Sequence, residues 1–255
     1  MPGVWSTNYW IILLIIFLRY AVLSLVAYLV FYVIFRNRWA FRKIQIRFPQ
    51  VSDYRREFLY SVFTAFIFAG VGYSLFGTGL RNYTQLYLNV ADYGWVYFGL
   101  SIPLMLIIHD TYFYWTHRAM HHPSVFRWFH KVHHLSTNPS PWASFAFHPL
   151  EAIVEAGIIV VIALIMPVHP LAIGLFLLIM MAYNVYGHLG YEVYPKGFSR
   201  SGLGRWINTS VNHNQHHQFF KGNYGLYFLW WDRWMGTLRS DYDRQFDDVK
   251  SRVAA

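Results

Sequence analysis

Cysteine is absent from the 255 residues of this chain, which excludes disulfides, thiolate zinc sites, iron–sulfur clusters and a cysteine nucleophile. Charge is also scarce, because only 13% of the residues are Asp, Glu, Lys or Arg while 56% are hydrophobic. A soluble domain carries nearer a quarter charged residues. The composition therefore argues against a soluble globular protein, and its hydrophobicity excludes a disordered one.

Long apolar runs account for the low charge. Residues 9–35 contain one charge, Arg19, and at about 1.5 Å per residue they can cross a hydrocarbon core of about 30 Å. Uncharged runs follow at 58–80, 93–108 and 156–191. The last run is broken at Pro167-Val168-His169-Pro170, which predicts a tight hairpin between two short spans. We therefore expect an all-α, multi-span membrane bundle with five spans, the last two short enough to be re-entrant.

The basic residues predict how this bundle is oriented. Lys and Arg number 21 against 12 acidic residues, and seven of the basic residues lie between Arg36 and Arg56. If the first span runs from outside to inside, 19 of the 21 fall on the cytoplasmic side, all but Arg19 and Arg81. This asymmetry is typical of membrane proteins and explains the net charge of +9 without a nucleic-acid partner.

The two ends of the sequence bear on localisation. Residues 1–6 lack a positively charged n-region and a cleavage site, so we expect the first span to be retained. The sequence closes on Lys-Ser-Arg-Val-Ala-Ala, without a recognisable ER-retrieval signal. These features favour a multi-pass protein of a bacterial inner membrane over one of the ER.

Histidine is unusually abundant, with thirteen residues against twelve acidic ones. Eight of them fall into three motifs, HRAMH, HKVHH and HNQHH. These eight are His117, His121, His130, His133, His134, His213, His216 and His217. On a helix, residues three or four apart share one face. Each motif is therefore expected to present two or three imidazoles to a common point, just outside the cytoplasmic end of a span.

A metal explains such clustering. Imidazoles gathered without one repel each other when protonated and lose hydration when neutral. Imidazole suits Zn, Cu, Fe and Ni, but eight or more ligands exceed one tetrahedral zinc site and fit two adjacent ions. The H-E-x-x-H metalloprotease motif is absent, and no motif carries the glutamate of a soluble di-iron carboxylate bundle. The sequence thus predicts a cytoplasm-facing, histidine-rich di-metal cap.

The motifs together resemble a known family. The segment HDTYFYWTHRAMHHPSVFRWFHKVHH, followed by HPLE, GHLGYE, HNQHH and GNYGLYFLWWDRWMGT, is similar to the fatty acid hydroxylase/sterol desaturase superfamily of membrane non-haem di-iron oxygenases. The family pattern of H-x3-H, H-x2-H-H and a later H-x2-H-H is complete here. Within the superfamily, SPWASFAFHPLEA resembles sterol C-5 desaturases. We expect one membrane domain, 1–255, with N-terminal spans over 1–100 and the catalytic region over 101–240.

This resemblance implies that the eight motif histidines are iron ligands and catalytic residues. It also implies further donors from a helix between the second and third motifs, where Asn184 and His188 stand four residues apart.

Other residues are expected close to the ligands, because a ligating imidazole commonly donates its second N–H to a carboxylate. The acids near the motifs are Asp110, Glu151, Glu155, Glu192 and Asp232. Of these, Asp110, Glu155 and Asp232 are expected around the ligands, together with His148, which we expect there or facing substrate. His109 lies eight residues before His117, about 12 Å along a helix, which looks too deep for the same metal.

The resemblance implies an O2-dependent oxidoreductase that contains two Fe ions. Its expected reaction is hydroxylation or desaturation of an unactivated C–H position in a membrane lipid of sterol or fatty-acyl type. Electrons are expected from a cytochrome b5-like or ferredoxin-like donor on the basic face. The alternatives are a zinc-dependent membrane hydrolase, which predicts a catalytic Glu beside a ligand pair, and a metal transporter, which predicts ionisable residues across the spans. Spans 9–35 and 58–80 offer almost none.

Overall fold

A computed structural model describes residues 8–253 of the chain. Residues 1–6, on which the expected retention of the first span rests, and the last two residues of the C-terminal sequence lie outside this range. Within it the fold is helical and contains no β-strand, only three isolated bridges. The expected all-α membrane bundle is therefore confirmed.

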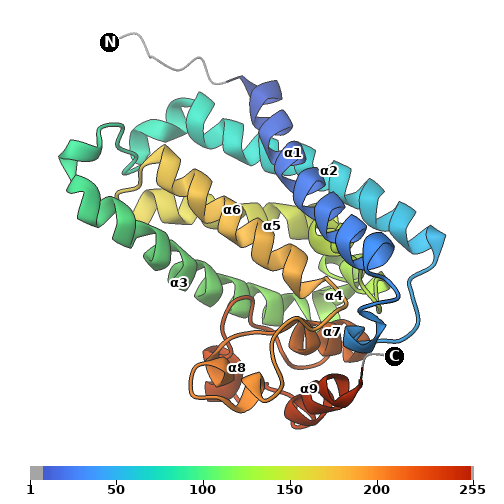
Figure 1. The fold of residues 1–255 in the computed structure, drawn as a ribbon. Helices are drawn as coiled ribbons and strands as arrows, with labels where there is room; N and C mark the ends of the chain where they lie inside the picture. Colours follow the sequence, from blue (N-terminus) through green and yellow to red (C-terminus); the bar gives the residue numbers. More distant parts are fainter. Residues whose placement is uncertain (1–7, 254–255) are drawn as a thin grey trace.

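Four helices are long and apolar enough to cross a membrane (Figure 1). They are α1 (Tyr9–Tyr28, continued by a π-helical turn, Leu29–Ile34), α2 (Val51–Gly77), α3 (Gly94–Met120) and α6 (Pro170–Gly187). Shorter helices complete the fold: α4 (Pro123–Phe129), α5 (Pro149–Ile165), α7 (Ser210–Phe219), α8 (Trp230–Trp234) and α9 (Tyr242–Ser251). The expectation of five spans is thus corrected to four, because α5, with 17 residues, is too short to count.

The hairpin between α5 and α6 nevertheless reaches the end of the bundle opposite to the C-terminal helices. Its tip contacts the connection between α2 and α3. Gln85 N–H donates to Ala163 O at 2.7 Å and Tyr87 N–H to Val168 O at 3.2 Å. The Tyr97 hydroxyl donates to Pro167 O at 2.8 Å. The break expected at Pro167–Pro170 is present, between the end of α5 and the start of α6.

Three helices begin at a His-Pro pair. His122, His148 and His169 are the N-cap residues of α4, α5 and α6, and a proline follows each one. Each imidazole accepts a hydrogen bond from a backbone N–H of the first turn, and the proline needs no hydrogen-bond acceptor there. These three histidines therefore have a structural role at helix starts.

The apolar surface is divided between a protein core and an exposed belt. Leu75, Met105, Ile162 and Phe176 are fully buried where α2, α3, α5 and α6 meet. The outer side of α1 instead exposes more than half of the surface of apolar side chains such as Ile11. Because no soluble protein leaves such a helix uncovered, this belt indicates contact with lipid.

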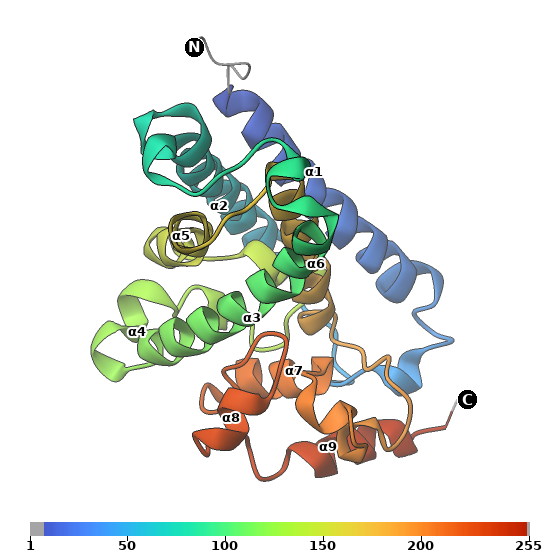
Figure 2. The same ribbon diagram turned by 90° about the vertical axis from the view of Figure 1, so that its left-hand side faces the viewer.

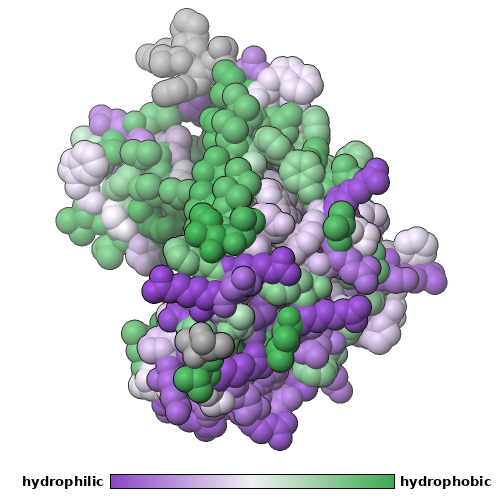
Figure 3. Space-filling model, turned by 45° about the vertical axis from the view of Figure 1, so that its right-hand side comes forward, coloured by the Kyte–Doolittle hydropathy of each residue, from purple (hydrophilic) through white to green (hydrophobic). Residues whose placement is uncertain are grey.

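The C-terminal third forms a polar cap at one end of the bundle. Figure 2 shows α7, α8 and α9 gathered below the long helices. A small core of Val211, Leu229, Tyr242 and Phe246 holds this cap together. In Figure 3 hydrophilic residues dominate the end that carries the cap, while hydrophobic residues cover the helices at the other end. The cap lies directly beneath the ends of α3 and α6, where the histidines are.

Candidate metal centre

Nine histidines converge in two groups at the junction of the bundle and the cap. Within each group, one ring nitrogen of every member lies within 4.8 Å of those of all the others. The first group contains His117, His121, His130, His134 and His216. The second contains His133, His188, His213 and His217. All are buried except His121, which is partly exposed.

The two groups do not follow the sequence motifs. In HKVHH, His130 and His134 join the first group while His133 joins the second. In HNQHH, His216 belongs to the first group and its neighbour His217 to the second. The expectation that each motif serves one point is therefore wrong. The reason is that each of these two motifs lies between the two histidine groups, so that the side chain at i+3 points to one group and the side chain at i+4 to the other. In addition, His133 begins a short 3₁₀ turn and not an α-helix.

The Nε2 atoms of the histidines point at one another. In the first group, His117 and His130 bring their Nε2 atoms within 2.8 Å, and those of His121 and His134 lie 3.1 and 3.0 Å from that of His216. In the second group, the Nε2 atom of His188 lies 3.2, 3.1 and 3.1 Å from those of His133, His213 and His217.

Backbone carbonyls hold the other ring nitrogen of four histidines. The Nδ1 atoms of His117, His188, His216 and His217 lie 2.7–3.0 Å from the carbonyl oxygens of Tyr224, Asn184, Gly222 and Ser136, respectively. A carbonyl oxygen can only accept, so Nδ1 carries the proton in these rings and Nε2 carries a lone pair. Several lone pairs therefore face each other at about 3 Å, which is repulsive unless a cation lies among them.

The donor set fits metal ions. With an imidazole–metal bond of about 2.1 Å, ligand nitrogens at right angles lie about 3.0 Å apart, and tetrahedral ones about 3.4 Å apart. The shortest Nε2 separations, 2.8–3.2 Å, lie closer to the right-angle value than to the tetrahedral one. Five imidazoles in one group also exceed a tetrahedral site. The two groups therefore suit a metal with more than four ligand positions better than structural zinc.

Burial keeps these imidazoles neutral. It lowers the pKa of His121 to about 2 and that of His188 to about 4. For His130, His134 and His216, burial and then neighbouring imidazoles lower the pKa well below the usual value. A metal ligand must be unprotonated, so the site is prepared for a cation at neutral pH.

One carboxylate contacts the histidines directly. Glu151, in the first turn of α5, accepts a hydrogen bond from Nδ1 of His130 at 2.5 Å, and both side chains are buried. The sequence indicates Glu151 only as a nearby acid. The available signal was its position in the first turn of a helix that begins at His148-Pro149, directly after the second motif.

Asp110 and Asp232 act on the histidines indirectly, by binding the loop whose Gly222 and Tyr224 carbonyls orient two of them. Asp232 accepts hydrogen bonds from the backbone N–H groups of Tyr224 and Gly225 at 2.9 and 2.8 Å. Asp110 accepts from those of Tyr227 and Phe228 at 2.8 and 3.2 Å. They fix the 222–228 loop, whose Gly222 and Tyr224 carbonyls orient two histidines.

The remaining predicted residues have other surroundings. His148 caps α5 and belongs to neither group. Glu155 lines a cavity among the long helices. Asn184 donates through Nδ2 to Ser144 O at 2.8 Å and lines the same cavity. His109 also belongs to neither group; its Nδ1 lies 2.9 Å from the Tyr227 hydroxyl.

The chain is similar to known lipid enzymes. The fatty acid hydroxylase family model matches residues 102–237. Delta(7)-sterol 5(6)-desaturase ERG3B of Gibberella zeae is 32% identical over 161 residues, which cover 63% of this chain and 48% of that protein. Lathosterol oxidase of Mus musculus is 35% identical over 169 residues, which cover 65% and 54%. The human lathosterol oxidase is 29% identical over 191 residues, which cover 74% and 62%.

The chain thus spans about half the length of the first curated relatives that it matches. No solved structure matches it significantly. The region of similarity contains both histidine groups, the 222–228 loop and most of α3, α5 and α6.

Proposed function

The chain belongs to the fatty acid hydroxylase family, and on that premise we propose that it is an O2-dependent oxidoreductase that hydroxylates or desaturates an unactivated C–H position of a membrane lipid. Two iron ions are the proposed cofactor, one for each histidine group. The observation that carries the proposal is the pair of groups of five and four inward-facing imidazoles directly beside a membrane-embedded cavity.

Iron bound in both groups would supply the O2 activation needed to break a strong C–H bond. The protein's part is to hold the ligands and keep water away. The nine histidines are the proposed ligands, with Glu151 orienting His130 and the backbone carbonyls orienting four others. We include Asn184 through its Oδ1, because its Nδ2 is already bonded to Ser144 O.

The substrate is proposed to enter from the bilayer. A cavity of about 380 Å³ lies among α1, α2, α3, α5 and α6, a volume within the range of small-molecule sites. Its inner end includes Phe113 and Phe147, whose rings lie 4.9 and 5.1 Å from those of His117 and His133. A lipid chain in this cavity would present a carbon to both groups while aromatic side chains exclude water.

Electrons are proposed to come from a separate cytochrome b5-like or ferredoxin-like protein. Arg118, Lys221, Arg239 and Arg244 line a surface depression next to the 222–228 loop. Gly222 lies in the same depression, and its carbonyl holds Nδ1 of His216. Only Gly222 therefore separates this basic surface from the proposed ligand His216. The positive charge of the surface favours an acidic electron donor.

Metal analysis of the purified protein tests the proposal. We expect two iron atoms per chain, and conversion of a lipid to an alcohol or alkene that requires O2 and a reductant. His134→Ala and His188→Ala should lower bound iron and abolish turnover. His169→Ala, which alters the cap of α6 and a contact with Leu88 O at the end of the bundle opposite to the histidine groups, should leave iron unchanged. One zinc per chain, or full turnover in His134→Ala, would reject it.

A further inference from the structure

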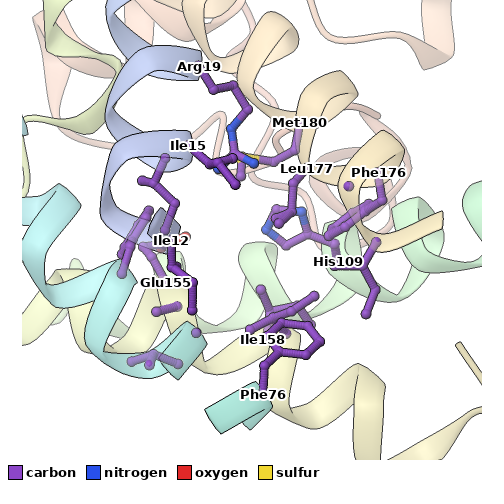
Figure 4. A pocket seen from close by; sticks show the side chains of 18 of the residues that line it. Ile12, Ile15, Arg19, Phe76, His109, Glu155, Ile158, Phe176, Leu177 and Met180 are labelled. Carbon is purple, nitrogen blue, oxygen red and sulfur yellow. The ribbon is translucent and has the colours of Figure 1, made fainter. Parts of the chain in front are cut away.

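The membrane-embedded cavity is mostly apolar, with Arg81 at its far end and Asn184 near the histidines as polar side chains at its two ends. It runs from Phe113, Phe147 and Leu226, next to the histidine groups, to Leu88 and Pro170 at the opposite end of the bundle. Between these ends, three ionisable side chains line it from three different helices: Arg19 from α1, His109 from α3 and Glu155 from α5. Figure 4 shows Arg19 reaching into the cavity opposite the His109 ring, with Glu155 on another side.

None of the three is neutralised by another. Within residues 8–253, Arg19 has no hydrogen bond or ion pair, and its buried Nε is unsatisfied. Glu155 has no hydrogen bond or ion pair in the same range either. His109 uses only Nδ1, on the Tyr227 hydroxyl, which leaves Nε2 without a partner among the described residues. Charges at membrane depth are costly, so groups retained there without partners indicate a function.

The three groups favour a neutral polar ligand. Arg19 is a donor, Glu155 can accept, and the free His109 nitrogen can donate or accept according to its tautomer. The opposite charges of Arg19 and Glu155 offset each other, so a carboxylate or phosphate would gain one partner and be repelled by the other. A hydroxyl both donates and accepts, and it satisfies this set without adding charge.

The positions of His109 and Glu155 along their helices give the distance between a hydroxyl bound there and the histidine groups. His109 lies eight residues before His117 on α3, about 12 Å along the helix, and Glu155 lies one turn, about 6 Å, beyond Glu151 on α5. A hydroxyl bound there is therefore about 6–12 Å from the level of the histidine groups.

We propose that Arg19, His109 and Glu155 bind the hydroxyl group of a neutral lipid alcohol, and that this contact sets which carbon lies beneath the histidines. This rests on the proposed function for the identity of the reaction, but the binding itself requires neither iron nor turnover. Free fatty acids and phospholipid head groups are excluded from this level of the cavity.

Binding to metal-free protein in detergent tests the proposal. The probes are tritiated cholesterol, its methyl ether, which cannot donate, and its sulfate, which is anionic. The alcohol should bind about tenfold or more tightly than either derivative, the worth of a hydrogen bond to a charged group. Glu155→Gln should remove most of the preference over the sulfate and weaken the preference over the ether, because it removes the negative charge that accepts from the hydroxyl. Arg19→Leu should weaken binding of all three probes, the sulfate most, because every probe loses the same donor. Arg81→Leu, which removes a charge at the far end of the same cavity, should retain the preference for the alcohol.

Thermal unfolding separates ligand binding from a structural role. Because Arg19 has no partner within residues 8–253, Arg19→Leu should not lower the Tm of the ligand-free protein. Should that variant fail to fold, Glu155→Gln still tests whether the alcohol is preferred through a contact at this level of the cavity. Equal binding of all three probes, unchanged preference in Glu155→Gln, or unchanged affinity for the alcohol in Arg19→Leu overturns the proposal. Loss of iron or of lipid oxidation would instead count against the proposed function, and the binding result would be unaffected.

Discussion

Glu151 differs from the backbone carbonyls that orient four of the histidines, because it is ionisable: burial raises its pKa well above the usual value, and a bound cation would favour its negative form. Four imidazoles are held by neutral carbonyls, whereas His130 is held by a buried carboxylate at 2.5 Å. A carboxylate that accepts a hydrogen bond from one ring nitrogen of an imidazole fixes the tautomer of the ring and makes the other nitrogen a stronger ligand. His130 should therefore be the strongest donor of the five-histidine group.

We predict that Glu151→Gln weakens metal binding in this group about 10- to 100-fold, the usual effect of removing such a partner. Metal analysis after dialysis against a graded chelator measures it. Glu155→Gln is the matched control, since it changes the same residue type one turn along the same helix without contacting a histidine of either group. Equal metal retention in the two variants would show that the Glu151 charge is irrelevant.

Lys43 is a second residue whose charge is unusual. Its side chain is 1% exposed, and Nζ lies 5.2–5.5 Å from the ring centroids of Tyr32, Phe48 and Tyr191. Burial lowers the pKa of Lys43 to about 7. In the unfolded chain this lysine has its ordinary pKa of 10.5 and binds more protons than in the folded chain between about pH 7 and 10.5, so its contribution to stability rises with pH in that window.

Lys43→Met should remove this pH dependence. At pH 7 we expect the variant to have a Tm higher by roughly 2 °C or more, because a buried amine is replaced by an apolar side chain of similar length. At pH 10 the gain should shrink. Thermal unfolding in detergent at both pH values measures the difference, and a lower Tm in the variant at pH 7 would mean that the three rings more than compensate for burial.

The residues of the site were predictable where spacing determines them. Eight of the nine clustered histidines lie in motifs. The ninth, His188, follows a long apolar run, where an imidazole is costly unless it binds a partner. Spacing says nothing about backbone carbonyls such as those of Tyr224 and Ser136, because their position depends on how distant loops pack. It also misses the division into two groups, which is a property of the assembled helices.

At the scale of elements, the 222–228 loop connects α7 to α8 and is held by side chains from outside it. Asp232 alone accepts from Tyr224 N–H, Gly225 N–H and the Thr237 hydroxyl, at 2.7–2.9 Å, and is fully buried. The loop in turn orients His117 and His216, which belong to the five-histidine group. Its conformation is therefore coupled to the five-histidine group, where one metal ion is proposed to bind.

Asp232→Ala should destabilise the loop and reduce bound metal together. Each hydrogen bond to a charged group contributes about 1.5–3 kcal/mol, so we expect a Tm lower by about 5 °C or more. Asp232→Asn should recover only part of it, because an amide nitrogen cannot accept from a backbone N–H. Asp243→Asn on the surface of α9 is the control. A destabilised variant with full metal content would separate the loop from the site.

Helices were more predictable than their number of membrane crossings. The apolar runs correspond to α1, α2, α3 and the α5–α6 hairpin, because hydrophobic length is a local property. Whether α5 crosses the membrane depends on the position of its C-terminal end. That position is set by contacts of the α5–α6 hairpin tip with residues 85–88, more than seventy positions earlier in the sequence. His148 and His169 each precede a proline and cap a helix. From the sequence we interpreted His148 as a residue of the site and His169 as part of a hairpin loop.

At the scale of the whole molecule, the charges and the histidine groups share one end. The connection from α1 to α2 lies at this end, since Ile44 N–H donates to Gly190 O at 3.0 Å and Arg56 reaches Leu135 O at 3.1 Å. The opposite end carries the 78–93 connection, in which Arg81 is the one basic residue. This segregation of positive charge is what the positive-inside rule predicts if the histidine groups lie on the cytoplasmic side, with α1 running inward.

Single cysteines test this orientation directly, because the natural chain contains none. We predict that a membrane-impermeant thiol reagent labels Ser124→Cys and Lys221→Cys, both exposed beside the histidine groups, only from the cytoplasmic side. Asn82→Cys, exposed in the 78–93 connection, should be labelled only from the other side. The reason is energetic: inversion would place the seven basic residues between Arg36 and Arg56 outside, against both the positive-inside preference and the anionic inner leaflet, at about 1 kcal/mol for each residue near the surface. Labelling of Ser124→Cys from outside would reverse the topology and, with it, the side from which an electron donor must approach.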